Sequence, residues 1–328
     1  MKNPDELKKY YDEQLLPELK VLEGERKKTL LKMLLLTGGL FFLFIFISIV
    51  ALVFDNSGSL CGVVLCCPLP IFLMIWTFGC NFIKKGYVKG FKGSIIAKIV
   101  KFIDPALEYA HDKGISREMF SRSRIFLQTV DLFSSEDYVS GIIDKTKIEF
   151  SEVHAQDKQE THDSDGHHQT RYVTIFKGVF FAADFNKSFK GRTLVLPDTA
   201  QKLFGNLIGS VLQGKNFMRP PLVKLEDPEF EKLFVVYGDD QVEARYILST
   251  SLMSRITEFK KKSGRDIFLS FVDDKVIVAL PYKKDLFEPH LFRSIMDYPA
   301  VEAYFRDLQF VLSLVGDLNL NTRIWSKE

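Results

Sequence analysis

The stretch MLLLTGGLFFLFIFISIVALVF, Met33–Phe54, carries no charged side chain over 22 residues, and it decides how the rest of the chain is organised. A second run, LCGVVLCCPLPIFLMIWTFGCNFI, Leu60–Ile83, carries none over 24 residues. A helix that crosses a bilayer needs about 20 apolar residues, so each run is long enough to span a membrane. Only the polar link Asp55–Ser59 separates them. The sequence therefore predicts an antiparallel two-helix transmembrane hairpin over residues 33–83.

Basic side chains flank this predicted hairpin on both sides. The connecting link Asp55–Ser59 contains no basic residue. Basic residues close to a span are retained on the cytoplasmic side, so we expect both termini in the cytoplasm and a multi-pass protein of the plasma (inner) membrane. The flanking residues are Arg26, Lys27, Lys28 and Lys32 before the first span, and Lys84, Lys85, Lys89, Lys92, Lys98 and Lys101 after the second.

Two other classes of segment also contain apolar runs of this kind. The core helix of a soluble protein is disfavoured by two runs of this length with such asymmetric flanks. A cleavable signal peptide is disfavoured because the first run begins only at Met33 and is too long for such a segment.

The overall composition limits the classes of function. The net charge of +2 gives no support for nucleic acid as a partner. All four cysteines, Cys61, Cys66, Cys67 and Cys80, fall in the second predicted span. The remaining sequence thus has no disulfide and no thiolate chemistry, as expected in a reducing cytoplasm.

The segments beside the hairpin are predicted to be helical. Residues 1–32 form an amphipathic cytoplasmic helix that starts at Asn3-Pro4 and is kinked or restarted at Pro17. Its apolar side is formed by Leu7, Tyr11, Leu15, Leu19 and Leu22. Residues 84–124 form a basic linker with amphipathic helices, one of which starts at Ser94. This helix would either lie on the lipid headgroups or pack on the soluble domain.

Residues 125–328 are predicted to form an α+β cytoplasmic domain, because strand patterns come in runs without alternating helices. The polar stretch 155–169 separates two of these strands, 145–154 and 170–185, which suggests a long hairpin. A helix is expected after Pro197-Asp198, and an amphipathic C-terminal helix over Pro299–Val315. The expected fold is a mainly antiparallel sheet with this helix. A small barrel or bent sheet closed by the helix, as in pleckstrin-homology-like modules, would also fit.

The most conspicuous polar cluster lies between His154 and His168. Imidazole and carboxylate groups are metal ligands, so a metal-dependent enzyme that uses this loop is one alternative. The stretch Asp163–Gly166 places Thr161 and Tyr172 where a calcium loop needs acids, which disfavours calcium. The cluster is composed of His154, Asp157, His162, Asp163, Asp165, His167 and His168. The chain lacks a P-loop, a dinucleotide fingerprint, an HExxH helix and a GxSxG elbow, so neither an enzyme nor a cofactor is expected.

Several motifs along the chain are distinctive when taken together. They are Tyr10-Tyr11 with Leu16-Pro17-Glu18-Leu19, Ile148–His154, Phe176–Asn186, Gly191-Arg192-Thr193 with Leu196-Pro197-Asp198, Leu225–Phe230 and Asp240–Leu248. Together they resemble an uncharacterised bacterial membrane-protein family, domain of unknown function 3137. The resemblance implies a two-span protein with a large cytoplasmic domain, and a LemA-type membrane protein as a partner. It transfers no catalytic residue. The glycines Gly178 and Gly191 are expected in turns, and Arg245 is expected to pair with an acid such as Glu243 or Glu226.

The function that the sequence favours is that of a non-enzymatic integral membrane protein, whose hairpin anchors a cytoplasmic interaction domain. The glycine and cysteine residues of the spans are compatible with a homo-oligomer. The main alternative is a module that binds membrane lipids through their headgroups. Its candidate contacts are Lys84, Lys85, Lys89, Lys92, Lys98 and Lys101.

Overall fold

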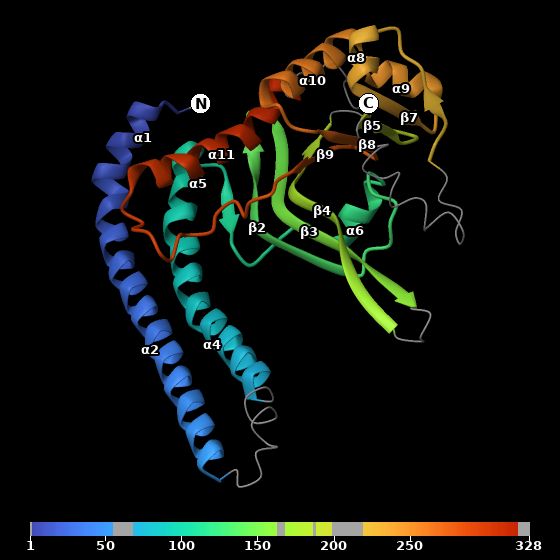
Figure 1. Ribbon diagram of the computed structural model, residues 1–328. Coiled ribbons are helices and arrows are strands. Elements are labelled where there is room, and N and C mark those ends of the chain that lie inside the picture. The colour runs from blue at the N-terminus through green and yellow to red at the C-terminus, as the bar shows by residue number, and fades with distance from the viewer. Residues whose placement is uncertain (1, 55–67, 163–167, 186–187, 199–218, 321–328) are drawn as a thin grey trace. The chain divides into compact units, whose positions relative to one another are not determined.

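The computed structural model describes residues 2–54, 68–162, 168–185, 188–198 and 219–320 (Figure 1). The contacts within the chain divide it into two compact units. The helical unit comprises Lys2–Lys98 and Phe287–Tyr304, and the sheet unit comprises Ile99–Leu286 and Phe305–Glu328. The segment 287–304 is thus grouped with the N-terminal helices, although it lies within the predicted soluble domain.

The helical unit begins with α1 (Pro4–Tyr10), a π-helical turn η1 (Tyr11–Leu15) and the long helix α2 (Leu16–Phe54). The side chain of Asn3 accepts the backbone N–H of Asp5 and caps α1, as expected. Pro17 cannot donate a hydrogen bond to the preceding turn, and the wider π-helical turn accommodates this loss without ending the helix. The predicted kink or restart is therefore a continuous helix with a π-turn before Pro17. Of the predicted apolar side, Leu7, Tyr11, Leu15 and Leu19 are buried, and Leu22 is half-buried.

Helix α4 (Pro68–Phe91) packs along α2 within the same unit. The indole N–H of Trp76 donates to Oγ1 of Thr37 at 2.9 Å, and the rings of Phe44 and Phe72 meet edge to face at 5.5 Å. In the described part of the chain one helical run, Pro4–Val50, is long and apolar enough to cross a membrane. The second predicted span lies only partly within the described residues, so this criterion does not establish the two-span hairpin.

The segment after α4 continues as a π-helical turn η2 (Lys92–Ile96) and the helix α5 (Ala97–Ile103). Its apolar residues Ile95, Ile96, Ile99 and Val100 are fully buried. The apolar side chains of the amphipathic segment that starts at Ser94 are therefore covered by protein atoms.

The sheet unit contains one sheet of nine strands in the order β1-β2-β3-β4-β9-β8-β5-β7-β6, and all recorded pairs are antiparallel. The prediction of a mainly antiparallel α+β domain is confirmed. The order is linear among the described strands, which fits an open sheet and not a closed barrel. The strands are β1 (Glu108–Ala110), β2 (Leu132–Ile143), β3 (Thr146–His162), β4 (His168–Asp184), β5 (Thr193–Pro197), β6 (Leu222–Val223), β7 (Phe234–Gly238), β8 (Phe268–Val272) and β9 (Lys275–Pro281).

Strands β3 and β4 form the long hairpin that the alternation predicts, and they are the longest pair in Figure 1. The pairing runs from Ile148 with Ala183 to His162 with His168. The stretch 155–162, expected to be turn-rich, is therefore a strand. The sequence of this stretch lacks a strand pattern because, among the described strands, the distal ends of β3 and β4 pair only with each other, and polar side chains are tolerated there.

Gly178 is in the middle of β4 and not in a turn. Its φ of +155° is rare for residues with a side chain, and a Cβ atom would collide with the carbonyl oxygen of Leu280 on β9. Arg245 also differs from expectation, since its guanidinium contacts the carbonyl oxygen of Lys224 and the side chain of Gln241. The acid Glu243 instead accepts the backbone N–H groups of Lys190 and Gly191.

The remaining helices are short except for two. The predicted C-terminal amphipathic helix is confirmed, because it is observed and one of its sides is buried. The buried residues include Val301, Tyr304, Phe305, Leu308, Val311, Leu312 and Val315. The helix expected after Pro197-Asp198 lies outside the described residues. The helices are α6 (Arg117–Arg122), α8 (Pro228–Leu233), α9 (Gln241–Ile247), α10 (Thr250–Ser263) and α11 (Tyr298–Asp317).

Phenylalanine rings from several elements fill the core of the sheet unit. Phe120 of α6 stacks on Phe126 at a centroid distance of 5.3 Å, and it also meets Phe180 of β4 at 5.2 Å. Such aromatic pairs add a favourable contact to the burial of their large apolar area. They attach the α6 region firmly to the face of the sheet.

Candidate functional site

A buried ion pair lies at the start of α2, a short distance before its apolar part. Arg26 donates from Nε and Nη2 to both carboxylate oxygens of Glu23, at 2.9 and 2.6 Å. Both side chains are buried. The hydrogen bond from Arg26 is the main reason why the pKa of Glu23 is lowered from its usual value. The two side chains therefore hold each other in place, and their remaining polar atoms can bind another segment of the chain.

That segment is 287–304. Nη1 of Arg26 donates to the carbonyl oxygen of Leu291 at 2.7 Å, and the backbone N–H of Ile295 donates to Glu23 at 3.3 Å. The phenol of Tyr11 donates to the carbonyl oxygen of Met296 at 2.6 Å. We call Glu23 and Arg26, with their contacts to Leu291 and Ile295, the Arg26 clamp. It satisfies backbone groups that a loop would otherwise leave to water.

Glu288 fastens the same segment to α4 and η2. Its carboxylate lies 3.2 Å from Nζ of Lys84 and 3.0 Å from Nζ of Lys92. Its backbone carbonyl oxygen accepts the phenol of Tyr304 at 2.9 Å. Lys92 is only 3% exposed, so this ion pair balances a buried positive charge.

The six lysines predicted to contact headgroups thus fall into two groups. Four of them have partners inside the protein, because Lys84 and Lys92 meet Glu288, Lys98 pairs with Glu18, and Lys101 donates to the carbonyl oxygen of Pro105. Lys85 and Lys89 are exposed and make no recorded polar side-chain contact within the described part of the chain. The candidate lipid contacts with uncommitted charges are therefore Lys85 and Lys89.

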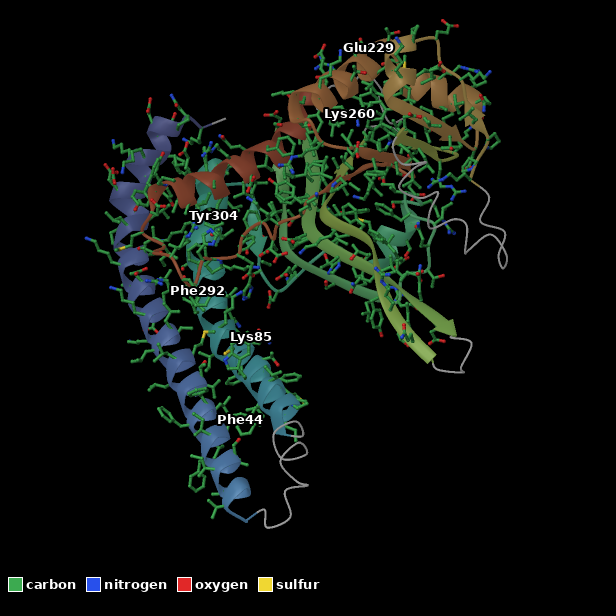
Figure 2. All side chains as sticks on the ribbon, viewed as in Figure 1. Phe44, Lys85, Glu229, Lys260, Phe292 and Tyr304 are labelled. Carbon is green, nitrogen blue, oxygen red and sulfur yellow. The ribbon has the colours of Figure 1, made fainter. Side chains whose placement is uncertain are left out.

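Phe292 lies between Leu291 and Ile295, the two residues that the Arg26 clamp contacts, and nothing in the sequence marks it. Its side chain is 82% exposed, whereas Leu291 and Ile295 on either side are buried. In the view of Figure 2, Phe292 is labelled beside α4, above Lys85. An apolar residue that alternates with buried neighbours gives no distinct pattern in a loop, so only the structure could reveal its exposure.

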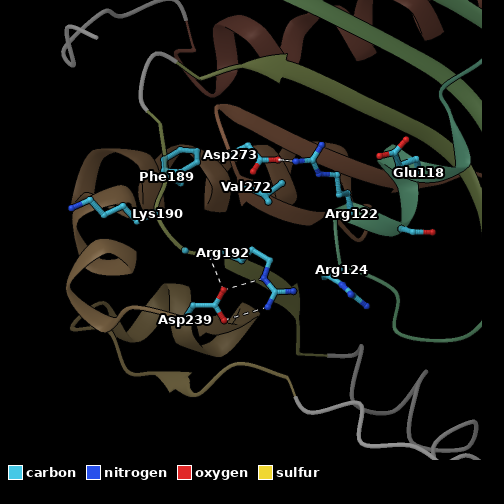
Figure 3. A pocket seen from close by; sticks show the side chains of 11 residues that line it. Glu118, Arg122, Arg124, Phe189, Lys190, Arg192, Asp239, Val272 and Asp273 are labelled. Carbon is cyan, nitrogen blue, oxygen red and sulfur yellow. Dashed lines mark hydrogen bonds and ion pairs between the residues drawn. The ribbon is translucent and has the colours of Figure 1, made fainter. Parts of the chain in front are cut away.

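The sheet unit contains a separate pocket of about 490 Å³ beside α6 and the turn after β8 (Figure 3). Arg192 donates to Asp239 at 3.0 Å, and Arg122 pairs with Asp273 at 3.0 Å. Lys190 also lines the pocket, but its amino group points away from the arginines in Figure 3. The charges are nearly balanced, and neither His nor Cys is among the lining residues. This arrangement is not that of a nucleophile with its base.

A buried acidic group lies elsewhere on the sheet. Glu152 of β3 is 6% exposed and accepts the backbone N–H of Leu286 at 2.9 Å. Burial, together with the nearby charges of Asp285 and Asp137, raises the pKa of Glu152 to about 7, although the hydrogen bond from Leu286 opposes this rise. Lys177 pairs with Asp285 at 2.7 Å. Glu152 therefore titrates near neutral pH.

The predicted metal loop receives no support from the described residues, which contain no group of three or more metal-binding side chains. Nε2 of His154 lies 3.2 Å from Oγ1 of Thr174 on β4. Burial lowers the pKa of His154. Asp163, Asp165 and His167 lie outside the described residues.

Comparison with known families adds one finding about this chain. Residues 174–320 match the model of a family described as "Protein of unknown function (DUF3137)". The chain resembles the DUF3137 family. The match extends over the C-terminal part of the chain, whereas the motifs in the sequence suggested a likeness along nearly all of it.

The chain was also compared with curated proteins and with solved structures. No curated protein matches the chain. Among solved structures, the chain is similar to the mycobacterial trehalose monomycolate transport factor A, TtfA, with 11% identity and a TM-score of 0.31, over 68% of this chain and 94% of that one.

Proposed function

We propose that this protein is a non-enzymatic membrane protein, in which α2 and α4 form a two-span hairpin that anchors the sheet unit in the cytoplasm. The main support for this proposal is the exposure of large apolar side chains along both helices. Phe42 of α2 is 72% exposed and Phe82 of α4 is 83% exposed. Water penalises such surface by about 25 cal/mol per Å², whereas lipid does not. None of the most apolar window of α2 is buried, unlike the core helix of a soluble protein.

The contacts between the two helices support the second span. Leu36 of α2 packs over Gly79 of α4, where a Cβ atom would lie 2.6 Å from Cδ2 of Leu36. Small residues at such a crossing allow helices to approach closely in lipid. The hydrogen bond from Trp76 to Thr37 also satisfies two polar groups that lipid would leave unpaired.

Membrane residence can be tested by alkaline carbonate extraction of membranes that contain the full-length chain. The proposal expects the protein to stay in the pellet and to be released only by detergent. Release by carbonate would contradict an integral anchor.

The sheet unit is proposed to bind a partner protein, and the resemblance suggests a LemA-type membrane protein. The test is purification of the tagged full-length chain in mild detergent, followed by mass spectrometry against a chain that ends at Lys98. A stoichiometric partner with the full chain alone supports an interaction domain. Recovery of the chain by itself in both samples would argue against it, and the mass of the purified assembly would report a homo-oligomer.

A further inference from the structure

The segment 287–304 lies close to the expected surface of the bilayer. Arg26 precedes the apolar run at Met33 by seven residues, which is about 10 Å along a helix. Arg26 donates to the carbonyl oxygen of Leu291, so the segment contacts α2 at about the same distance from the apolar run. On α4, the contact of Glu288 with Lys84 lies directly after the last apolar residue, Ile83. The headgroup region extends about 5–8 Å beyond the hydrocarbon, so the segment borders it.

The exposure of Phe292 is imposed by its neighbours. Leu291 and Ile295 are buried, and both are tied to the Arg26 clamp through their backbones. The backbone on both sides of Phe292 is therefore held in place, which favours the outward position of its ring. Leaving a phenylalanine in water costs about 1.5–3 kcal/mol relative to burying it.

Exposed positive charge occurs on the same membrane-proximal part of the helical unit. Arg293 follows Phe292 in the chain and is exposed, and Lys85 on α4 is exposed two residues after the last apolar residue of the second span, Ile83. Lys89 is one turn further along α4 and is also exposed. An aromatic ring among uncommitted cations is the composition that anionic membrane interfaces attract.

We propose that Phe292 and Arg293 form a third membrane contact, in which the ring enters the headgroup boundary of an anionic bilayer while Arg293, Lys85 and Lys89 meet the phosphates. This inference rests on the proposed membrane anchor. In this proposal the exposed side chains of Phe292 and Arg293 bind lipid, and the Arg26 clamp holds them in position.

The test measures the depth of tryptophan in proteoliposomes of phosphatidylcholine and phosphatidylglycerol. The chain has two tryptophans, Trp76 and Trp325, so three single-tryptophan proteins are made. The first keeps Trp76 and carries Trp325→Phe. The second adds Phe292→Trp to a chain with Trp76→Phe and Trp325→Phe. The third places Val21→Trp in that same background, since Val21 is 70% exposed on α2 about 18 Å before Met33.

Quenching by lipids brominated near the headgroup and near the chain end then ranks the three positions. We expect Trp76 to be quenched strongly, the tryptophan at position 292 to be quenched mainly by the shallow bromines with blue-shifted emission, and the tryptophan at position 21 to remain unquenched. In vesicles of phosphatidylcholine alone, the quenching at position 292 should fall at least twofold.

Trp76 and position 21 serve as controls that distinguish failure of the third membrane contact from failure of the membrane anchor. If Trp76 is quenched while position 292 behaves as position 21 does, the third contact is refuted and the anchor stands. If Trp76 itself is not quenched, the anchor fails and the inference fails with it. Equal circular dichroism spectra of the three proteins exclude misfolding. Positions 21 and 292 are exposed, so tryptophan fits there without disturbing the fold.

Discussion

The guanidinium group of Arg26 donates a hydrogen bond to the carbonyl oxygen of Leu291, which is 2.7 Å away in space and 265 residues later in the chain. The same side chain is held by Glu23, whose other contact is the N–H of Ile295. One ion pair on the first helix therefore fixes a late segment of the chain within the helical unit.

Substitution of Arg26 by alanine should loosen that segment. It leaves the carboxylate of Glu23 buried and unpaired, which costs about 3 kcal/mol. Hydrogen exchange of the full-length protein in detergent should show faster exchange over residues 291–296. The matched control is Lys27→Ala, since Lys27 is exposed on the next position. Equal protection in both variants would show that the Arg26 clamp does not hold the segment.

Lys92 and Lys85 should differ in their effect on stability. Lys92→Met removes a buried cation and leaves Glu288 with fewer partners, so we expect a loss of about 1–3 kcal/mol in unfolding free energy. Lys85→Met changes an exposed residue and should stay within about 0.5 kcal/mol. Thermal unfolding of both variants in the same detergent compares them. A larger loss for Lys85→Met would mean that the roles of the two lysines are reversed.

Glu152 should make the stability of the sheet unit depend on pH. Its folded pKa of about 7 is above its usual value of 4.5, so the folded state binds more protons than the unfolded state between these limits. The stabilisation is complete below pH 4.5 and is lost as the pH rises through 7. Glu152→Gln should therefore be more stable than the parent at pH 8 by about 1–3 kcal/mol, with the difference shrinking toward pH 5.

The control for this pH series is Glu118→Gln, because Glu118 is exposed. Denaturant unfolding at pH 5, 6, 7 and 8 supplies the measurement. Parallel pH profiles for the parent and Glu152→Gln would show that this carboxyl does not titrate near neutrality.

Two glycines should respond to alanine in opposite directions. Gly178→Ala places a Cβ atom against the carbonyl oxygen of Leu280 at a φ that alanine avoids, and we expect a loss of at least about 2 kcal/mol. Gly24→Ala meets nothing within 4 Å inside α2 and should stabilise the helix by about 0.5–1 kcal/mol. Thermal unfolding measures both. A gain for Gly178→Ala would show that β4 is free to shift at this point.

The elements with strong periodic patterns could be predicted from the sequence. The C-terminal helix, the long hairpin of β3 and β4, and the apolar side of residues 7–19 follow directly from the spacing of apolar residues. The end of β3 could not be predicted, because polar residues such as Lys158 and Glu160 interrupt the alternation of apolar residues there. The buried state of Lys92 also gave no local signal, since its partner Glu288 is nearly 200 positions away.

In the candidate site, too, local sequence patterns predict some residues and not others. Lys85 and Lys89 could be predicted as membrane-proximal from their place after the apolar run. Phe292 and the Arg26 clamp could not, because their significance depends on contacts between residues that are distant in sequence. A buried arginine in a helix looks like an exposed one until its partners are known.

The topology of the link between the two proposed spans tests the two-span hairpin most directly. Alkaline phosphatase, which is active only outside the cytoplasm, is inserted after Ser57 in one chain, and green fluorescent protein, which fluoresces in the cytoplasm, is fused after Glu328 in another. A two-span hairpin with both termini in the cytoplasm should give an active phosphatase at Ser57 and a fluorescent C-terminus. An inactive phosphatase at Ser57, in a full-length chain that remains in the membrane fraction, would contradict the two-span hairpin.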